Sequence, residues 1–401
     1  MKQGWEIKNF SDVCELVGGS QPSKDEFIYE PKDGYIRLIQ VRDYRTDKFV
    51  TYIPKEKARR FCETEDIMIG RYGPPIFGIF KGIEGAYNVA LMKAVVNEKI
   101  CNRDYFYLFL KTDKLREFVE HSSKRAAGQD GIRKELLDKY PVPLPPLPEQ
   151  QRIVAILDEA FAAIAKAKAN AQQNLQNAKE LFESYLQGVF ENKGEGWEER
   201  TLGEVCELIN RGVSPKYIEN GGMIVLNQKC IRDHSINFDP SRFHDAKSKK
   251  VSEEKIIKKG DVLINSTGTG TLGRVAQVRE ELKNVTVDSH VTIVRPIPNM
   301  FFIDFFGWAL IFIEEEIAKR GEGCGGQTEL ARSTLKNDFS ICFPKSIKTQ
   351  QTIVQKLDAL NAETKKLESI YQQKINDLEE LKQSILQKAF SGELRTVRGE
   401  V

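Results

Sequence analysis

Residues 268–273, with the sequence GTGTLG, have the glycine spacing of a dinucleotide-binding loop. Such a loop leads directly into a helix, because N–H groups at the helix N-terminus bind the pyrophosphate. Here residues 274–278 (RVAQV) follow, and their composition is typical of a strand. The missing helix argues against a nucleotide site. We therefore expect neither a nucleotide nor any other cofactor.

The cysteines and histidines are also poorly placed for chemistry. The seven cysteines include no Cys-x-x-Cys pair and there are only four histidines, so the sequence predicts neither a zinc site nor a disulfide framework. Widely spaced cysteines in odd number are typical of reduced thiols. The sequence contains no convincing helicase, nuclease or methyltransferase motif. We expect no catalytic residue and no metal.

Side chains suited to binding nucleic acid occur instead in the predicted loops. Such side chains can donate to phosphates, contact base edges or stack on bases. In the first half of the chain the candidates are Arg42, Tyr44, Arg45, Lys48, Arg71 and Tyr72. In the second half they are Asn227, Lys229, Arg232, Asn265, Ser266, Thr267, Thr269, Thr271 and Arg274.

Taken singly, each of these residues is more commonly solvated surface than a DNA contact. The overall charge does not decide the matter, because 60 basic residues against 58 acidic ones leave a net charge of +2. Their placement favours binding. At corresponding points of the two halves, polar residues and glycines follow a predicted strand, as Arg71, Tyr72 and Gly73 in one half and residues 265–268 in the other.

The elements that must hold these loops are strands and short helices. Residues 35–41, 66–69, 223–226 and 261–264 are predicted strands because they are rich in Ile, Val and Leu. Residues 103–121 and 303–319 are predicted helices. Residues 140–148 contain five prolines, which remove N–H donors and fix φ, so an extended lead-in is expected there.

The two halves repeat each other. Gly-Trp-Glu at residue 4 returns at residue 196, 192 positions later, and Val-Cys-Glu-Leu at 13–16 returns unchanged at 205–208. Gly78 corresponds to Gly273 at an offset of 195, and Gln150-Gln151 corresponds to Gln350-Gln351 at an offset of 200. A few loop residues were therefore gained in a duplicated unit, which predicts an internal pseudo-twofold repeat.

Residues 149–192 and 349–392 are predicted to be long helices. Their apolar residues recur at alternating steps of three and four, the seam of a coiled coil. A helix of about 40 residues is roughly 60 Å long and needs a partner of similar length. We expect the two helices to pair antiparallel and to bury Ile153, Leu157, Leu357 and Leu360 between them.

These elements predict an α+β fold with two similar, mixed α/β globular domains separated by an antiparallel coiled coil. The predicted boundaries are 1–148 and 193–348 for the globular domains, and 149–192 and 349–401 for the helices and the C-terminal tail. No run of 18 apolar residues and no signal-peptide core is present. No membrane association is expected, and the chain should be cytoplasmic.

This organisation resembles the specificity subunit of type I restriction-modification enzymes, over nearly the whole chain. The most recognisable parts are the Gly-Trp-Glu starts at Gly4 and Gly196, residues 65–73 (EDIMIGRYG) and residues 143–154 (PLPPLPEQQRIV). Residues 386–394 (LQKAFSGEL) also resemble the end of such subunits.

The resemblance implies a non-catalytic protein that recognises double-stranded DNA with two target recognition domains, each bound to one half of a bipartite, asymmetric site. It further implies that the helices set the spacing and dock two methyltransferase subunits, which bind S-adenosylmethionine and methylate adenine. Two motor-nuclease subunits would join for restriction. On this resemblance the chain itself is not an enzyme.

Two other interpretations remain open. A duplicated coiled-coil scaffold could bind protein partners only, which the near-neutral charge permits. A nucleotide-dependent transferase could use residues 268–273, and saturable nucleotide binding would support it. The DNA sequence recognised does not follow from the residues, because a side chain in a loop of unknown shape does not specify a base.

Overall fold

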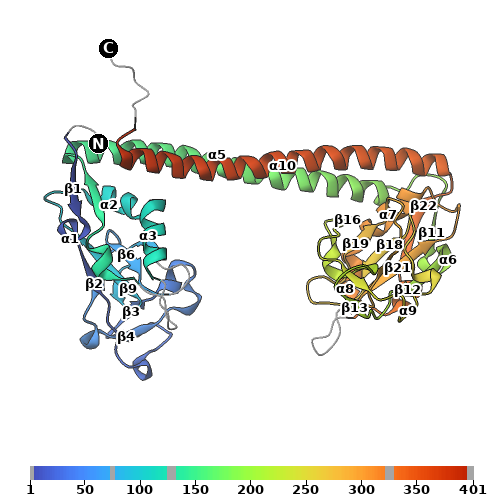
Figure 1. Ribbon diagram of the computed structural model, residues 1–401, viewed down its shortest axis with the longest axis horizontal. Coiled ribbons are helices and arrows are strands. Elements are labelled where there is room, and N and C mark those ends of the chain that lie inside the picture. Colours follow the sequence, from blue (N-terminus) through green and yellow to red (C-terminus); the bar gives the residue numbers. More distant parts are fainter. Residues whose placement is uncertain (1–3, 73–76, 124–131, 321–328, 395–401) are drawn as a thin grey trace, which may run out of the picture. The chain divides into compact units, whose positions relative to one another are not determined.

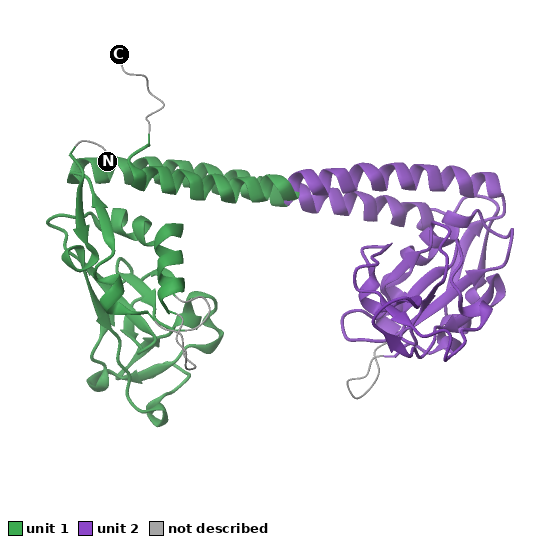
Figure 2. Ribbon diagram, in the orientation of Figure 1, with its two compact units in different colours: residues 1–172, 372–401 green, residues 173–371 purple. Residues whose placement is uncertain are grey.

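The computed structural model describes residues 4–72, 77–123, 132–320 and 329–394. The chain forms two compact units (Figure 2). Unit 1 comprises residues 1–172 and 372–401, and unit 2 comprises residues 173–371. Each unit holds one mixed α/β part together with half of each long helix. The four-part division into 1–148, 149–192, 193–348 and 349–401 stays a prediction.

The globular part of unit 1 is built on two four-stranded sheets (Figure 1). The first is antiparallel with the order β2-β9-β6-β7; the second has the order β4-β3-β8-β5, in which β3 and β8 are parallel. A two-stranded sheet, β1-β10, lies apart from them. In chain order the elements, with η for 3-10 helices, are β1 (Glu6–Asn9), α1 (Phe10–Val13), β2 (Cys14–Gly18), η1 (Lys24–Glu26), β3 (Tyr35–Ile39), η2 (Val41–Tyr44), η3 (Asp47–Phe49), β4 (Tyr52–Pro54), η4 (Lys55–Lys57), β5 (Phe61–Cys62), β6 (Ile67–Gly70), β7 (Ile79–Lys81), β8 (Gly85–Tyr87), β9 (Leu91–Val96), α2 (Arg103–Leu110), α3 (Asp113–Ser123), α4 (Lys134–Leu137) and β10 (Pro141–Leu144).

Unit 2 repeats this plan. Its antiparallel sheet has the order β12-β21-β18-β19, and its mixed sheet has the order β13-β17-β14-β20, in which β14 and β20 are parallel. The elements are β11 (Trp197–Thr201), α6 (Leu202–Val205), β12 (Cys206–Arg211), β13 (Tyr217–Ile218), β14 (Met223–Leu226), η5 (Gln228–Cys230), β15 (Ile231–Arg232), β16 (Ser235–Ile236), β17 (Arg242–His244), η6 (Glu253–Lys255), β18 (Val262–Asn265), β19 (Val275–Gln277), β20 (Val285–Val287), β21 (Val291–Pro296), α7 (Ile303–Phe312), α8 (Glu314–Arg320), α9 (Arg332–Asp338) and β22 (Ser340–Pro344). The predicted two-domain α+β fold is confirmed.

Strand pairing corrects one detail of the predicted repeat. Ile69 pairs with Ile79 in unit 1, and Ile264 pairs with Val275 in unit 2. Phe77 and Gly273 each lie two residues before the equivalent residues Ile79 and Val275. Phe77, not Gly78, is therefore the structural equivalent of Gly273. Both residues have positive φ, 63° for Phe77 and 87° for Gly273. The loop in unit 2 is therefore one residue longer than its counterpart.

Each predicted helix before the long helices is in fact two helices. Residues 103–121 form α2 and α3, and residues 303–319 lie within α7 and α8. The chain bends at Thr112, whose hydroxyl donates to the carbonyl of Phe109 at 2.8 Å. A hydroxyl that bonds a local carbonyl competes with helix continuation. The bend lets α2 bury Tyr105 and Phe106 in the core of unit 1.

The two long helices, α5 (Leu147–Glu191) and α10 (Ile347–Ser391), begin slightly earlier than predicted. The first turn of α5 includes Pro148, which is tolerated because an N–H there has no helical partner. The N-terminal cap of α10 is Ser346, whose hydroxyl accepts from the Thr349 N–H at 3.3 Å. The proline-rich lead-in before α5 is β10, paired with β1.

Within each unit, the start of one long helix packs beside the end of the other. In unit 1, Ile153 and Leu157 of α5 share a core with Leu386 of α10, and Lys168 forms an ion pair with Glu379 at 2.8 Å. In unit 2, Leu186 of α5 shares a core with Leu357 of α10. The predicted antiparallel pairing is confirmed. Ile153, Leu157 and Leu357 are buried as expected, whereas Leu360 is only half-buried.

The repeated glutamine at the start of each long helix joins that helix to its globular part. Gln150 and Gln350 are both fully buried. The side-chain carbonyl of Gln150 accepts from the N–H of Asn102 at 2.7 Å, and that of Gln350 accepts from the N–H of Phe302 at 2.7 Å. Their amide groups donate to backbone carbonyls before the helix. The motif is therefore a structural junction.

The cysteines within the described ranges are all free thiols, and Cys324 lies outside those ranges. Most are buried, and burial raises the pKa of Cys101 and Cys206 to about 12. A thiol with a raised pKa is a poor nucleophile at neutral pH. No helix in the described ranges combines the length and apolar character needed to cross a bilayer.

Candidate nucleic-acid interface

In unit 1, three strands end at one edge of the globular part. The N–H of Asn88, just after β8, donates to the carbonyl of Ile39 at the end of β3 at 3.0 Å. The N–H of Arg71, just after β6, donates to the carbonyl of Ala90 at 2.8 Å. The segments that leave β3, β6 and β8 therefore lie together, and they carry all six candidates of the first half.

Unit 2 has the same edge, closed by the same backbone hydrogen bonds. The N–H of Asp288 donates to the carbonyl of Leu226 at 2.9 Å, and the N–H of Ser266 donates to the carbonyl of His290 at 2.8 Å. Arg71 and Ser266 are thus equivalent positions, as the repeat predicted. The segments after β14, β18 and β20 carry the candidates of the second half.

A glycine allows close backbone packing behind each edge. A Cβ on Gly19 would lie 2.0 Å from the carbonyl oxygen of Asn88, and one on Gly212 would lie 2.0 Å from the carbonyl oxygen of Val287. Real Cβ atoms do not approach backbone this closely, so only glycine fits without displacement. In unit 1 the segment after β2 therefore packs directly against the turn after β8 and supports it. In unit 2 the segment after β12 supports the turn after β20 in the same way.

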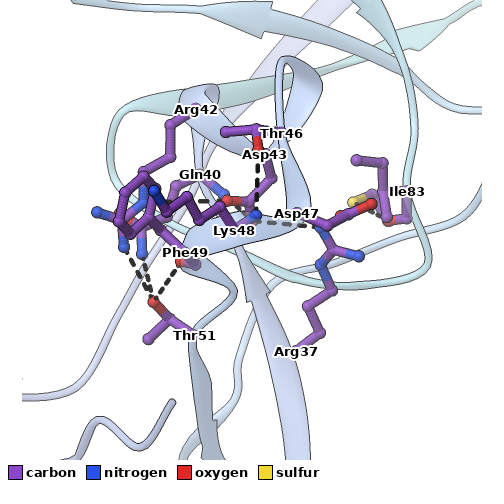
Figure 3. Close-up of polar contacts among 11 residues, drawn as sticks. Arg37, Gln40, Arg42, Asp43, Thr46, Asp47, Lys48, Phe49, Thr51 and Ile83 are labelled. Carbon is purple, nitrogen blue, oxygen red and sulfur yellow. Dashed lines mark hydrogen bonds and ion pairs between the residues drawn. The ribbon is translucent and has the colours of Figure 1, made fainter. Parts of the chain in front are cut away.

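The segment after β3 is fixed by a buried threonine. Thr51 is fully buried, and its hydroxyl accepts from the Gln40 amide at 3.0 Å and from an Arg42 guanidinium nitrogen at 3.1 Å (Figure 3). Arg37 forms an ion pair with Asp47 at 2.7 Å from the other side of the segment. These contacts hold η2 and η3 against the sheet and leave their outer faces available.

Asp43 lies inside this segment rather than on its surface. The backbone N–H of Gln40 donates to its carboxylate at 3.1 Å, and Arg37 lies 3.8 Å away. Burial raises the pKa of Asp43, and Gln40, Arg37 and Arg42 oppose that shift. Asp43 offsets part of the positive charge of the two arginines from within.

The cations of unit 1 lie against two aromatic rings, the exposed Phe49 and the half-buried Tyr72. Phe49 is 50% exposed, and the charged groups of Arg42 and Lys48 lie 5.8 and 5.6 Å from its ring centre. Arg71 is exposed and lies 5.0 Å from the ring centre of Tyr72. Arginine and an aromatic ring side by side can bind a phosphate and stack on a base. Gly73 lies outside the described residues.

Two further candidates of unit 1 differ in accessibility. Arg45 is exposed and is engaged in an interaction within the fold. Tyr44 is half-buried and stacks on Phe80, with ring centres 4.2 Å apart. Burial also raises the pKa of the Tyr44 phenol. Its ring therefore supports η2, and it is a poor candidate for stacking on a base.

In unit 2 the segment after β14 is capped by Asn227. Its side-chain carbonyl accepts from the N–H of Lys229 at 2.9 Å, and its amide donates to the carbonyl of Pro240 at 2.7 Å. Both polar atoms of Asn227 are thus used within the fold. Lys229 is exposed and lies three residues after the end of β14, just as Arg42 lies three residues after the end of β3.

The loop after β18 is tied to that segment by hydroxyl and amide groups. Gln228 donates to the Thr267 hydroxyl at 2.8 Å, and its carbonyl accepts from the Thr271 hydroxyl at 3.1 Å. Thr267 also lies 2.8 Å from Nδ1 of His290. Arg274 donates to the carbonyl of Gly270 at 3.0 Å. The glycine-rich loop is therefore an ordered surface, and it continues into β19, the strand that the composition of residues 274–278 predicted.

Two candidates of unit 2 are inaccessible. Asn265 and Ser266 are fully buried, Asn265 donates to the carbonyl of Gln228 at 3.1 Å, and Ser266 contacts the Thr292 hydroxyl. A fully buried side chain does not reach a base unless the loop rearranges, so we assign them to loop support. Thr269 and Arg232 are exposed, and Arg232 lies 3.6 Å from Asp233.

Sequence reasoning missed three residues at these edges. Thr51 and Phe49 in unit 1 and His290 in unit 2 were not singled out. The repeat offers a signal for His290. At an offset of 200 it corresponds to Ala90, so equivalent turns of the two halves have a polar residue in one and an apolar residue in the other. For Thr51 no signal exists, since its importance comes from burial. Within the described ranges, no group of three His, Cys, Asp or Glu residues could hold a metal ion.

Comparison with known proteins adds to this geometry. A family model described as type I restriction modification DNA specificity domain matches residues 2–175 and again residues 194–380. The EcoKI specificity subunit of Escherichia coli K12 is 23% identical over 98% of this chain and 90% of its own length. The EcoBI specificity subunit of E. coli is 25% identical over 97% and 86%. The MjaVIII specificity subunit of Methanocaldococcus jannaschii is 26% identical over 59% and 56%.

Solved structures show the same fold. A chain from a study of complex assembly and conformational transition of the type I restriction-modification system matches with a TM-score of 0.79, at 20% identity over 98% of this chain and 99% of that chain. The HsdS subunit of Thermoanaerobacter tengcongensis matches with a TM-score of 0.59, at 20% identity over 98% of each chain. At such identity the similarity shows the fold alone.

Proposed function

This chain belongs to the type I restriction-modification DNA specificity family, and we propose that each of its two units binds one half of a bipartite DNA site. As a specificity subunit it serves DNA target recognition. The main support for this proposal is that three equivalent strands end at one edge of each unit. Both edges are closed by the same backbone hydrogen bonds, yet one presents arginine, lysine and aromatic rings while the other presents hydroxyl, amide and imidazole groups.

The proposed DNA contacts are the accessible candidates at these edges. In unit 1, Arg42, Arg45, Lys48 and Arg71 are suited to phosphates or guanine edges, and Tyr72 is suited to stacking. In unit 2, Lys229 and Arg232 are suited to phosphates, and Thr267, Thr269, Thr271 and Arg274 belong to the loop that would face bases. We place recognition of double-stranded DNA in the cytoplasm, where the host chromosome lies.

We further propose that the long helices dock two methyltransferase subunits. Apolar side chains remain exposed on them, with Leu181 at 53%, Ile370 at 50% and Leu381 at 47%. Single exposed apolar residues also occur on ordinary protein surface, so these three mark candidate contacts and not a defined interface. In this proposal the partners bind S-adenosylmethionine and methylate adenine, two motor-nuclease subunits join for restriction, and this chain contributes no catalytic group.

The salt dependence of binding tests the DNA proposal. The complex of this chain with its methyltransferase partners should bind duplex DNA with an affinity that falls linearly on a log–log plot of salt concentration, with a slope of about −0.9 for each phosphate contact. A complex that assembles but binds DNA weakly and without salt dependence would instead support the scaffold alternative, in which the coiled coil serves protein partners only.

The spacing role of the helices has its own test. Inserting one heptad into both helices, in register, preserves the apolar seam and adds about 10 Å at 1.5 Å per residue. The unspecified gap between the two half-sites should grow by about three base pairs at 3.4 Å each. Both half-site sequences should stay the same. An unchanged gap with retained methylation would show that the helices do not set the spacing.

A further inference from the structure

His290 lies in the turn between β20 and β21, and the backbone of that turn is fixed. Its N–H donates to the Asp288 carboxylate at 2.9 Å, and its carbonyl accepts from the N–H of Ser266 at 2.8 Å. Asp288 is almost fully buried. The imidazole is nevertheless exposed. A rigid backbone therefore presents a ring at the edge where the segments after β14, β18 and β20 meet.

The ring orientation is fixed by a chain of hydrogen bonds. The Thr271 hydroxyl donates to the Gln228 carbonyl at 3.1 Å, and the Gln228 amide donates to the Thr267 hydroxyl at 2.8 Å. The Thr267 hydroxyl lies 2.8 Å from Nδ1 of His290. The Thr267 hydroxyl has one proton and two lone pairs; the Gln228 amide uses one lone pair, and the hydroxyl proton is available to Nδ1.

An outward donor requires the tautomer in which Thr267 donates to Nδ1. A ring nitrogen that accepts a hydrogen bond carries no proton, so in this tautomer the proton of the neutral imidazole is on Nε2. Nε2 is at the far side of the ring from Thr267. Among the described residues, no group forms a hydrogen bond with Nε2 of His290, so in this tautomer the edge of unit 2 carries an oriented, unused N–H donor.

We propose that His290 contacts a base in the half-site bound by unit 2 and donates from Nε2 to an acceptor on its major-groove edge. This inference rests on the proposed DNA recognition. The acceptors available there are N7 and O6 of guanine, N7 of adenine and O4 of thymine, whereas cytosine presents an amino donor. Thr267 and Gln228 are positioning residues, which hold the ring through Nδ1.

Unit 1 lacks this device. The equivalent turn has a similar support, since the Ala90 N–H donates to the side-chain carbonyl of Asn88 at 3.1 Å, where the His290 N–H donates to the Asp288 carboxylate. Ala90 has no polar side chain, and the neighbouring loop position is Tyr72 rather than Thr267. His290 should therefore influence one half-site only, which makes the other half-site an internal control.

The test uses two substitutions, each of which places a polar amide atom near the position of one imidazole nitrogen. H290N keeps a carbonyl near the place of Nδ1, which can accept from Thr267, but it removes the outward donor. H290Q keeps an amide donor near the place of Nε2 but weakens the contact with Thr267. Each variant is expressed as the full chain with its methyltransferase partners, and the methylated sites are sequenced across the host genome.

In H290N, one position of the half-site bound by unit 2 should lose its preference, with methylation of sites carrying the disfavoured base rising about tenfold or more. H290Q should retain the preference at that position. T267V, which removes the hydroxyl that orients the ring, should relax the same position to a smaller extent. The half-site bound by unit 1 should be unchanged in all three variants.

Several outcomes would overturn the inference. An unchanged motif in H290N excludes a base contact, and equal loss of methylation at all sites indicates a phosphate contact instead. Relaxation in H290Q as large as in H290N would show that the outward donor is not what matters. These results differ from failure of the proposed function, in which the unsubstituted complex itself would methylate no defined two-part motif.

Discussion

The two units differ most where their frameworks agree most. In both, backbone hydrogen bonds join the ends of three equivalent strands, and a glycine presses behind the turn. At this edge of unit 1, Arg42 is held by a hydrogen bond to the buried Thr51. At the same edge of unit 2, His290 contacts Thr267, which is in turn held by Gln228. A framework held by backbone contacts leaves its side chains free to vary. This variation on a common framework is what the proposed recognition of two different half-sites requires.

The largest expected difference in stability between the units concerns an ion pair at each antiparallel sheet. In unit 2, Asp261 and Arg295 form two contacts of 2.7 Å and are almost fully buried. In unit 1, Asp66 and Lys93 form a single 2.6 Å contact and are both partly exposed. Arg295→Ala should cost about 3 to 5 kcal/mol in the free energy of unfolding, because it leaves the buried Asp261 carboxylate without its charged partner and with only the Lys258 N–H as a donor.

Lys93→Ala is the matched variant, and its cost should be clearly smaller since water can solvate Asp66. Urea unfolding of the full-length chain measures both values. If Lys93→Ala costs as much as Arg295→Ala, burial does not distinguish the two units at this position.

The helix junctions should behave alike in the two units. Leu157 in unit 1 and Leu357 in unit 2 are fully buried at junctions of both helices with a globular part. Replacing either by Ala should cost about 2 to 5 kcal/mol. Leu381→Ala, at a position 47% exposed on α10, is the control and should change stability by no more than about 0.5 kcal/mol. A strong effect at Leu381 would show that apolar contacts of α10 lie elsewhere.

The buried glutamines should separate the units by a smaller amount. Gln150 makes three hydrogen bonds and Gln350 makes two. Replacement by Ala leaves buried backbone groups without partners, which costs about 1 to 3 kcal/mol. Gln150→Ala should be the more costly of the two, and Gln151→Ala, at an exposed position, should be nearly neutral. Thermal unfolding of the three variants checks this order.

The smallest effects on stability are expected at the DNA edge of unit 1. Arg71→Ala or Tyr72→Ala should leave folding and methyltransferase assembly intact. Either change should weaken the half-site bound by unit 1 by about 1 to 3 kcal/mol at certain base pairs if a base contact is lost. Competition binding with single-base variants of the site measures it. Uniform weakening would indicate a phosphate contact, and no change would return these residues to ordinary surface.

Much of the fold followed from local pattern in the sequence. The apolar seam predicted α5 and α10, and the runs of Ile, Val and Leu predicted β6, β14 and β18, because periodicity and propensity act over a few residues. The break at Thr112 was missed since it depends on the packing of α2 and α3.

The candidate site followed less well. Loop composition pointed to Arg42 and Arg71, which are exposed, but equally to Asn265 and Ser266, which are buried by segments distant in sequence. Burial of a polar residue comes from tertiary contacts that no local pattern records. The repeat marks the turn at His290 as different from its counterpart at Ala90, but which role His290 could have became clear only from its contact with Thr267.

The most direct test is to sequence the DNA methylated in a host that expresses this chain with its methyltransferase partners. We predict a single motif made of two specified blocks separated by a gap of fixed length and unspecified sequence. Exchanging residues 266–274 for those of a relative should change one block and leave the other block and the gap as they were. A motif with one continuous block, or an exchange that alters both blocks, would contradict recognition by two separate units.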